Sequence, residues 1–370
     1  MLDLSRVLAG PFCAQVLGDL GADVIKVEQP GSGDPVRGFT PPSIGGVSTY
    51  YLSTNRNRRS MLADLHSAAD RAVVAELAHG ADVVIENFLP HQVEAFGLDA
   101  LRHGLPSVVW VSIRPASSGG PLAAQPAFDL LAQARSGLMG VTGSVASGPM
   151  KVGSPVADVL AGLYGAVAAL AGLHQRGRLG SASHFEVPLL EAAMSALVNQ
   201  GQSYLATGVV PGLLGNDHPS IAPYGPLATA DGIVMVAVGT DRQFSAFCGV
   251  LGRPELAEDP AFATNAMRVE HRDRLAAVLA EHFATAPTSH WLEVLAAGSI
   301  PCAPVNDVAQ ALAEPQVLAT GLLQSIDTPA GAVQVIGSPL LVDGERLLVR
   351  SSPPSLGHDD VSIRGALGPR

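Results

Sequence analysis

The sequence predicts an α/β fold with a doubly wound parallel sheet and two lobes. In the first half of the chain, short β-branched runs alternate with helical stretches, which is the pattern of crossover units that build a parallel sheet. The 40 glycines and the low aromatic content of 5% suit helices packed closely on a sheet and argue against an aromatic-rich β-sandwich. With 370 residues, 47% of them apolar, the chain exceeds the size at which one core usually divides in two.

The elements of the first lobe follow from local patterns. Residues 23–28, 82–86 and 108–113 are rich in valine and isoleucine, as strands are. Residues 10–20 and 70–79 place apolar side chains at helical spacing between these strands. Together they predict the strand and helix alternation of a doubly wound sheet.

The middle of the chain predicts a loop, two further helices and a strand. Residues 31–46 are rich in Gly, Pro and Ser, so we expect a surface loop of the kind that often lines sites. A helix over 156–174 leads to a strand over 184–187 and to another helix over 189–205. Residues 208–224 are loop-like, and we place the boundary between the lobes there.

The remaining residues predict a smaller α/β lobe. We expect a strand over 233–238, a helix over 241–251 and a longer helix over 268–286. The proline-flanked segment 300–305 then carries the chain back.

Composition excludes several classes of function. The formal net charge of −11 opposes a nucleic-acid backbone, so we expect no nucleic-acid partner. Cys13, Cys248 and Cys302 lie far apart without metal-ligand spacing, which predicts no metal site and a reducing compartment. The first ten residues contain two charged side chains, unlike a signal peptide, and the apolar run 159–173 is shorter than the ~20 residues that a bilayer requires. We therefore expect a buried helix there, no membrane partner and a cytoplasmic protein.

Asp158 is the first candidate for chemistry, because it lies at the beginning of an apolar, glycine-containing helix. It could simply cap that helix, since Asp accepts hydrogen bonds from first-turn amides. Ser154 is available as an alternative cap, with Pro155 at the favoured first helical position. Asp158 would then face either the core or a cleft, where the helix N-terminus favours the ionised form, a nucleophile suited to attack on a thioester.

Other motifs are absent or ambiguous. The chain lacks the G-x-G-x-x-G, Walker A, G-x-S-x-G and H-E-x-x-H patterns. His218 is the most site-like histidine, since it lies in a loop with Asn216 and Tyr224 nearby, although an ordinary loop histidine fits equally well. The arginines of residues 55–60 could bind phosphates or form a solvated basic face.

Several ordered motifs together resemble the class III CoA-transferase family, which includes formyl-CoA and carnitine CoA-transferases and the related α-methylacyl-CoA racemases. The resemblance extends from residue 1 to about 340. The motifs are Val7-Leu-Ala-Gly-Pro11, residues 18–28, Gly31-Ser-Gly-Asp34, residues 55–60, Glu86-Asn-Phe88, Asp158 in its apolar helix, residues 215–219, Pro223-Tyr-Gly225, residues 229–232 and residues 300–305.

The resemblance implies a fold, a dimer and a reaction. It implies a Rossmann-like large domain over 1–205, completed by about 310–370, with a linker and small domain over 206–309, in a homodimer of interlocked rings. It also implies transfer of coenzyme A between an acyl-CoA and a carboxylic acid, with coenzyme A as a substrate rather than a permanently bound cofactor. Relative to the family's first strand, the chain is short by several residues at Met1, as a misassigned start codon would leave it.

The resemblance also implies site residues. Asp158 would be the covalent nucleophile, and Asn216, His218 and Tyr224 are candidate substrate contacts. Several basic residues that hold CoA phosphates in formyl-CoA transferases are absent here, so we predict Arg37 and Arg58 as substitutes. The other predicted coenzyme A contacts are Leu8, Ala9, Ala63, Asp64, Leu65, Asn87, Phe88, Leu89, Pro126, Ala127, Phe128 and Asp129.

One position favours transfer over racemisation. The family's racemases carry Gly-His-Asp where this chain has Ala127, Phe128 and Asp129, because exchange of an α-proton needs an acid and a base on opposite faces of the substrate. Phenylalanine cannot move a proton. An α-methylacyl-CoA racemase and a nucleotide-binding α/β protein without transferase activity remain the alternatives.

Overall fold

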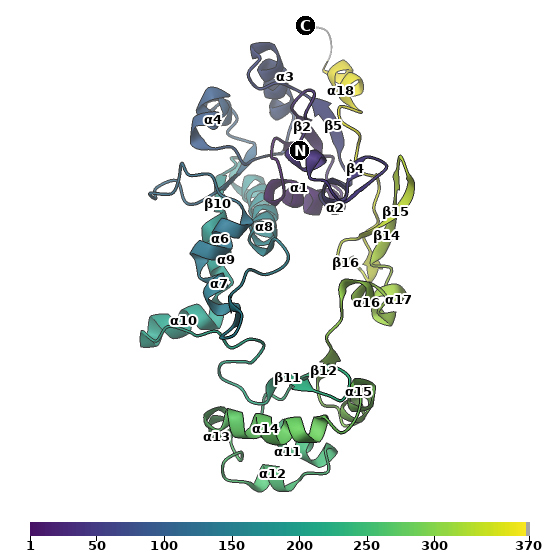
Figure 1. The fold of residues 1–370 in the computed structure, drawn as a ribbon. Helices are drawn as coiled ribbons and strands as arrows, with labels where there is room; N and C mark the ends of the chain where they lie inside the picture. The colour runs from purple at the N-terminus through teal and green to yellow at the C-terminus, as the bar shows by residue number, and fades with distance from the viewer. Residues whose placement is uncertain (368–370) are drawn as a thin grey trace. The chain divides into compact units, whose positions relative to one another are not determined.

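The computed structural model describes residues 1–367, and its contacts divide the chain into two compact units. The first unit comprises residues 1–139, 151–209 and the segment from Glu314 onward, and the second comprises residues 140–150 and 210–313. The expected domains were 1–205 with about 310–370, and 206–309. The structure differs in assigning residues 140–150 to the second unit. Figure 1 shows the course of the chain through both units.

The first unit is built on a six-stranded sheet in which every neighbouring pair of strands is parallel. From one edge to the other, the strands are β10 (His184–Pro188), β7 (Val109–Arg114), β6 (Val83–Glu86), β1 (Leu2–Asp3), β2 (Ile25–Glu28) and β5 (Arg59–Leu62). The chain proceeds from β1 to one edge, then returns and builds toward the other. The order therefore reverses between β1 and β6, which is where open α/β sheets place their ligands.

The two faces of the sheet carry separate cores, as a doubly wound sheet requires. Val83 and Ile85 of β6 pack on the face that α1 and α8 cover, whereas Val84 packs on the opposite face with residues of α3. The alternation follows from the period of two along a strand. The predicted doubly wound parallel sheet is confirmed.

Helices and short hairpins complete this unit. The helices are α1 (Ala9–Asp19), α2 (Thr49–Thr54), α3 (Ala68–His79), α4 (Pro90–Ala95), α5 (Leu98–His103), α6 (Asp129–Ser136), α8 (Val156–Leu179), α9 (Leu189–Ser195), α10 (Val198–Thr207), α17 (Pro315–Ala319) and α18 (Asp360–Ala366), with α7 (Leu138–Val141) at its boundary. The hairpins are β3 (Ser43–Ile44) with β4 (Val47–Ser48), β14 (Leu323–Thr328) with β15 (Gly331–Ile336), and β16 (Leu341–Val342) with β17 (Glu345–Arg346).

The second unit is a smaller α/β arrangement with its own core. Its antiparallel sheet has the order β11 (Tyr224–Ala228), β12 (Ile233–Ala237) and β13 (Cys302–Pro304). Its other elements are the hairpin β8 (Gly143–Ser144) with β9 (Gly148–Pro149) and the helices α11 (Asp241–Val250), α12 (Glu255–Glu258), α13 (Asn265–Glu270), α14 (Arg272–Phe283), α15 (Thr288–Ala297) and α16 (Val308–Leu312).

Two expected helices are each divided in the structure. The predicted helix over 189–205 is α9 and α10, and Val198 at the start of α10 has a φ of 35°, outside the right-handed helical range. The predicted helix over 268–286 is α13 and α14. Thr264 accepts a hydrogen bond from the amide of Met267, so α13 begins before the expected start.

The loop predicted over residues 31–46 contains more structure than expected. Asp34 caps a short 3₁₀ helix, η1 (Pro35–Gly38), by accepting a hydrogen bond of 3.1 Å from the amide of Val36. The β3 strand follows within the same segment. A local cap therefore gives this glycine-rich segment a defined turn.

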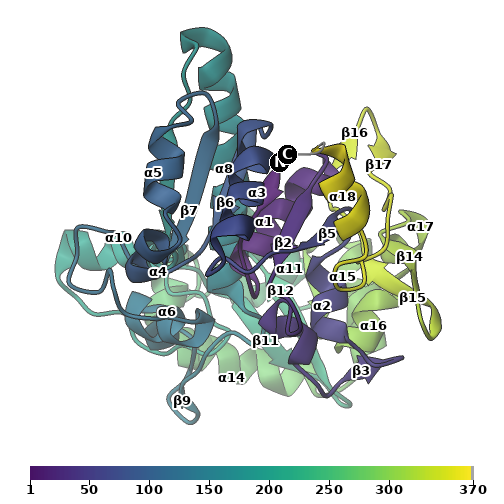
Figure 2. The same ribbon diagram turned by 90° about the horizontal axis from the view of Figure 1, so that it is seen from above.

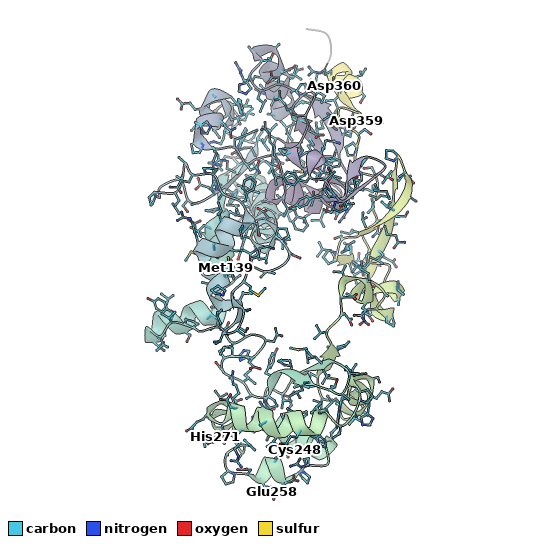
Figure 3. The ribbon with its side chains drawn as sticks, viewed as in Figure 1. Met139, Cys248, Glu258, His271, Asp359 and Asp360 are labelled. Atoms are coloured by element: carbon cyan, nitrogen blue, oxygen red, sulfur yellow. The ribbon has the colours of Figure 1, made fainter. Side chains whose placement is uncertain are left out.

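The C-terminal residues cover one edge of the parallel sheet. The amide of Ser60 donates to Asp359 Oδ2 at 2.9 Å, and the amide of Leu62 donates to Asp360 Oδ1 at 3.0 Å. These are the outward amides of edge strand β5, which has no further strand beside it among the described residues. Figure 2 shows α18 beside β5, and Figure 3 labels the two aspartates. Side-chain carboxylates thus satisfy an edge that could otherwise pair with another chain.

Helix α8 packs through small residues and is only half buried, so the prediction of a buried helix was wrong in part. Its buried residues are all alanine or glycine, whereas Leu163, Tyr164, Val167 and Leu170 are exposed. By length and composition alone, α8 is the one helix among the described residues that could cross a membrane. Its small-residue face instead packs on α1 and the sheet, as the core helix of a globular protein does.

Gly162 allows α8 to approach α1 closely, and this gives a prediction. A Cβ at Gly162 would lie 2.7 Å from the carbonyl oxygen of Ala9, a backbone atom. We expect Gly162→Ala to lower the free energy of unfolding by about 1–3 kcal/mol through overpacking. Gly177→Ala, in the same helix with nothing within 4 Å of the added Cβ, is the matched control and should stabilise the protein by about 0.5–1 kcal/mol. Chemical denaturation of both variants provides the measurement, and equal stability of the two would contradict it.

Candidate active site

A cavity of about 210 Å³ opens at the carboxyl ends of four strands of the parallel sheet. Residues that follow β1, β6, β7 and β10 line it, so it lies beside the point at which the strand order reverses. The lining residues are Arg6, Val7, Leu8, Ala9, Pro35, Asn87, Phe88, Leu89, Gln92, Ile113, Arg114, Pro115, Pro126, Ala127, Phe128, Asp158 and Leu189.

The cavity brings together many of the residues that the sequence singled out. Asp158 lies in its wall with three predicted segments, Leu8 to Ala9, Asn87 to Leu89, and Pro126 to Phe128. Asp158 and these three segments come from four different parts of the first unit. Their convergence on one carboxylate makes this cavity the candidate active site.

Asp158 occupies the third position of α8 but does not cap it. Asp129, the first residue of α6, supplies the cap by accepting a hydrogen bond of 2.8 Å from the amide of Ala157 through Oδ1. The side chain of Ser154 makes no capping bond, so that expected alternative was wrong. The physical reason is that a carboxylate from a different helix reaches the first turn. The carboxyl group of Asp158 therefore does not cap the helix and lies in the cavity wall.

Burial and the charge of Asp129 raise the pKa of Asp158 to about 7. Burial disfavours the ionised carboxylate, and the nearby negative charge adds to that effect. The position of Asp158 in the first turn of α8 acts in the opposite direction, because a helix N-terminus favours negative charge. Near neutral pH the group is therefore divided between a carboxylic acid and a basic carboxylate.

Tyr50 is a further group near these two carboxyls that the sequence did not reveal. Burial raises the pKa of its phenol, and Asp158 and then Asp129 raise it further by repulsion. Tyr50 lies in α2, far from both aspartates in sequence, and its ring packs edge-on against Phe39. No local pattern could indicate this proximity.

A strained turn presents Leu8 to the cavity. Val7 has a φ of 70°, which is unusual for a β-branched residue. Its amide donates to Asp34 Oδ1 at 3.1 Å, and Asp34 in turn forms a buried ion pair of 2.8 Å with Lys26. The ion pair with Lys26 therefore fixes the carboxylate of Asp34, which holds Val7 and stabilises the strained turn after β1.

A second buried ion pair organises the loop after β6. Arg114 Nη2 lies 2.7 Å from Glu86 Oε1, and the same pair holds the backbone of Phe88, with Glu86 Oε2 accepting from its amide and Arg114 donating to its carbonyl. The side chain of Asn87 forms reciprocal hydrogen bonds of 2.9 and 2.8 Å with the backbone of Arg6. The loops after β1 and β6 are thus joined directly at the cavity.

The structure places Arg37 and Arg58 outside the cavity wall. Arg37 forms an ion pair of 2.7 Å with Glu28 and lies over the ring of Tyr51. Arg58 is fully buried, with an ion pair of 2.9 Å to Asp3 and hydrogen bonds to two backbone carbonyls. The side chain of Arg58 is not exposed to solvent, so a phosphate could reach its guanidinium only if this ion pair and these hydrogen bonds rearranged.

The other predicted contacts lie elsewhere. Ala63 and Leu65 belong to the core beyond β5, and Asp64 between them accepts a hydrogen bond of 3.0 Å from the amide of His66. None of the three lines the cavity.

The candidate substrate contacts Asn216, His218 and Tyr224 belong to the second unit. The rings of His218 and Tyr224 lie 5.1 Å apart, and the amide of His218 donates to the carbonyl of Tyr224 at 3.1 Å. Tyr224 lines a cavity of about 50 Å³ with Asp217 and Arg272. Within residues 1–367, no group of three His, Cys, Asp or Glu side chains could hold a metal ion.

Comparison with known proteins points to one family. The model of CoA-transferase family III matches residues 1–360. The chain is 36% identical over 366 residues to the human succinyl-CoA:glutarate CoA-transferase, covering 98% of this chain and 84% of that protein. It is 35% identical over 368 residues to the acetyl-CoA:oxalate CoA-transferase of Acetobacter aceti, covering 98% and 93%. A solved CAIB/BAIF family protein from Brucella suis has a TM-score of 0.86 at 37% identity, covering 99% of this chain and 97% of that one.

The raised pKa of Asp158 gives a prediction about stability. The folded pKa of about 7 exceeds the ordinary value of 3.8, so the folded state holds the proton more tightly and loses stability as pH rises between these values. Above the folded pKa, ionised Asp158 lowers the free energy of unfolding by its full amount, up to about 4 kcal/mol. We expect Asp158→Asn to be more stable than the parent protein at pH 8, with a smaller advantage at pH 5.

Thermal or chemical unfolding of both proteins across this range is the measurement. A stability difference that does not change between pH 5 and pH 8 would show that the carboxyl group ionises as it does in the unfolded chain.

Proposed function

This chain belongs to CoA-transferase family III, and from that premise we propose that it transfers coenzyme A between an acyl-CoA and a carboxylic acid through covalent intermediates on Asp158. Its relatives support the transfer itself, because they are named for moving coenzyme A between carboxylic acids. The single observation that carries the role of Asp158 is its place in the wall of the cavity where the predicted coenzyme A segments converge.

The first half of the reaction would release the donor acid. The carboxylate of Asp158 attacks the thioester carbonyl, the C–S bond breaks, and a mixed anhydride and the thiolate of coenzyme A form. The thiolate then attacks the aspartyl carbonyl. The anhydride C–O bond breaks, the donor acid leaves as its carboxylate, and an aspartyl-CoA thioester remains.

The second half repeats these steps in reverse with a new acid. The acceptor carboxylate attacks the aspartyl thioester, which expels the thiolate and forms a second anhydride. The thiolate attacks the acyl carbonyl of the acceptor, giving a new acyl-CoA and restoring the carboxylate of Asp158. No net proton or electron is required, so the chain needs neither a metal nor a redox cofactor for these steps.

The environment of Asp158 suits this role. A carboxylate with a pKa of about 7 is more basic than an ordinary aspartate, and partial burial reduces the water around it, so it is the better nucleophile once ionised. Asp129 contributes by raising that pKa while it holds the first turn of α8 in place. Ala9, the first residue of α1, lines the cavity, and we propose that its backbone amide stabilises the oxyanion that forms during each attack.

The cavity would hold the reacting end of coenzyme A rather than the whole molecule. Its volume of about 210 Å³ is below the range of about 300–1,000 Å³ that is usual for drug-sized ligands. We propose that the pantetheine arm runs along the segments at Asn87 to Leu89 and Pro126 to Asp129, with the nucleotide toward Ala63, Asp64 and Leu65. Asn216, His218 and Tyr224 stay predictions for contacts to the acid.

Racemisation is the alternative with the most direct test, and the cavity disfavours it. Phe128 lines the cavity at the position where the family's racemases carry histidine, and 60% of its surface is exposed. Its ring has no ionisable group with which to return a proton to an α-carbon.

We also propose that the chain acts as a homodimer in the cytoplasm. Exposed apolar residues lie on α8, and α10 exposes Val198, Tyr204 and Leu205, whereas monomeric proteins seldom expose large apolar patches. A second copy of the chain, as the family resemblance implies, would cover this surface.

The oligomeric state follows as a prediction from this surface. Val167 on α8 is 62% exposed, and Val167→Glu places a charge that a covered apolar surface cannot solvate, so we expect a large loss of dimer at micromolar concentration. Val361→Glu, at a residue 86% exposed on α18, is the matched control and should leave the dimer intact. Light scattering coupled to size-exclusion chromatography reports both, and a monomeric parent protein would refute the proposal.

The proposed reaction predicts a loss of turnover without a loss of binding. Asp158→Asn removes the nucleophile, so transfer should fall by on the order of 10³-fold or more while coenzyme A still binds. The assay is mass spectrometry of the acyl-CoA pool in deuterated water, with a panel of acyl-CoA donors and carboxylic acids. Transfer at the parental rate by Asp158→Asn would refute the covalent role, and deuterium at the α-carbon without a new acyl-CoA would establish the racemase instead.

A further inference from the structure

We infer that the acid which receives coenzyme A carries a second carboxylate, and that Arg6 binds it. This inference rests on the proposed function, because it assigns a partner to the acid in the cavity of Asp158. It concerns a residue that takes no part in the covalent steps.

Arg6 is a cation in the cavity wall without an anionic partner. Its backbone is held by Asn87, and its guanidinium carbon lies 4.9 Å from the centre of the Phe88 ring. Among the described residues, no carboxylate forms an ion pair with it, and its side chain is partly buried. Burial lowers the pKa of Arg6, which shows that its charge has lost part of its hydration.

The nearest negative charge is already neutralised by another residue. Asp34 attracts Arg6 at a distance, but its own carboxylate forms an ion pair of 2.8 Å with Lys26 and accepts from the amides of Val7 and Val36. Asp34 is 2% exposed and belongs to the turn beneath the cavity. It therefore cannot swing out to pair with Arg6 without breaking the turn.

The remaining charges of the cavity leave Arg6 as its free positive group. Arg114, the other arginine in the wall, is bound by Glu86 at 2.7 Å. Among the described residues, Asp158 is the only carboxylate that lines the cavity, and the causes of its pKa shift are burial and Asp129, without an opposing effect of Arg6. The cavity thus has a nucleophilic carboxyl at one place and an unpaired guanidinium at another.

A second carboxylate of the acid is the anion that fits this arrangement. One carboxylate of the acid must react at Asp158, so an additional charge–charge contact within the same cavity requires a second anionic group close by. Guanidinium groups bind carboxylates through two parallel hydrogen bonds, and the cation–π contact with Phe88 limits the movement of this guanidinium. The phosphates of coenzyme A are separated from its sulfur by the long pantetheine arm, which we place along the segments at Asn87 to Leu89 and Pro126 to Asp129, so the phosphates would lie beyond this cavity of about 210 Å³.

The test compares acids of equal length that differ in the second carboxylate. Succinate, glutarate and adipate are paired with butanoate, pentanoate and hexanoate, and acetyl-CoA serves as the donor because it carries no free carboxylate on its acyl group. Arg6→Gln should raise the KM of the best dicarboxylate by about 10- to 100-fold, as expected for a lost charge-assisted hydrogen-bond pair. The KM values for its monocarboxylate counterpart and for acetyl-CoA should stay within about threefold.

Two further variants make the result specific. Arg6→Lys keeps the positive charge but lacks the paired N–H donors of a guanidinium, so its KM for the dicarboxylate should lie between those of the parent protein and Arg6→Gln. Such a partial recovery would also show that the effect of Arg6→Gln is not a folding defect. Arg242→Gln, at an exposed residue of α11 in the second unit, controls for the change in net charge and should behave as the parent protein.

Three outcomes would overturn the inference. These are a parent protein that uses monocarboxylates as well as dicarboxylates, an equal change in KM for both acids in Arg6→Gln, and a rise in the KM of acetyl-CoA alone, which would assign Arg6 to coenzyme A. Calorimetry of dicarboxylate binding to Asp158→Asn, with and without Arg6→Gln, separates the two proposals. Binding that depends on Arg6, found together with a parent protein that transfers no coenzyme A, would support the inference while refuting the proposed function.

Discussion

The hydrogen bond from the amide of Ala157 to Asp129 connects the parts of the candidate active site. It begins α8 at a defined residue, ties α6 to that helix and thereby positions the cavity segment that precedes α6. The same carboxylate raises the pKa of Asp158 by proximity. One acceptor therefore determines both where the reactive carboxyl lies and how basic it is, so geometry and reactivity at this site cannot vary independently.

Much of the fold could be predicted because its signals are local. Valine and isoleucine runs with turn residues between them located strands such as β6, and the alternation of Val83, Val84 and Ile85 between two cores follows from strand geometry alone. The residue that caps α8 depended on a less local signal. The cap of α8 comes from Asp129 in another helix, and Ser154 beside it was the wrong choice for that reason.

Residues of the candidate site could be predicted from the sequence only where they belong to a motif of the family. The family resemblance singled out Asp158 and several segments, and the structure places Asp158 and three of these segments in one cavity. The supporting ion pairs, such as Lys26 with Asp34, join residues that the folded sheet brings together. Their spacing along the sequence does not indicate that they pair. The buried ion pair of Arg58 with Asp3 could not be predicted for the same reason, because the sequence alone does not distinguish an arginine in a buried network from a phosphate contact.

The carboxylates that cover β5 have a consequence for how the chain is made. Ser60 and Leu62 leave the ribosome long before Asp359 and Asp360, so the edge of the sheet stays uncovered while the residues between them are made. A nascent chain that lacks Asp359 and Asp360 thus exposes the backbone amides of β5 to other nascent chains. Pairing between nascent chains through this edge should therefore cease once Asp359 and Asp360 have been made and have bound β5.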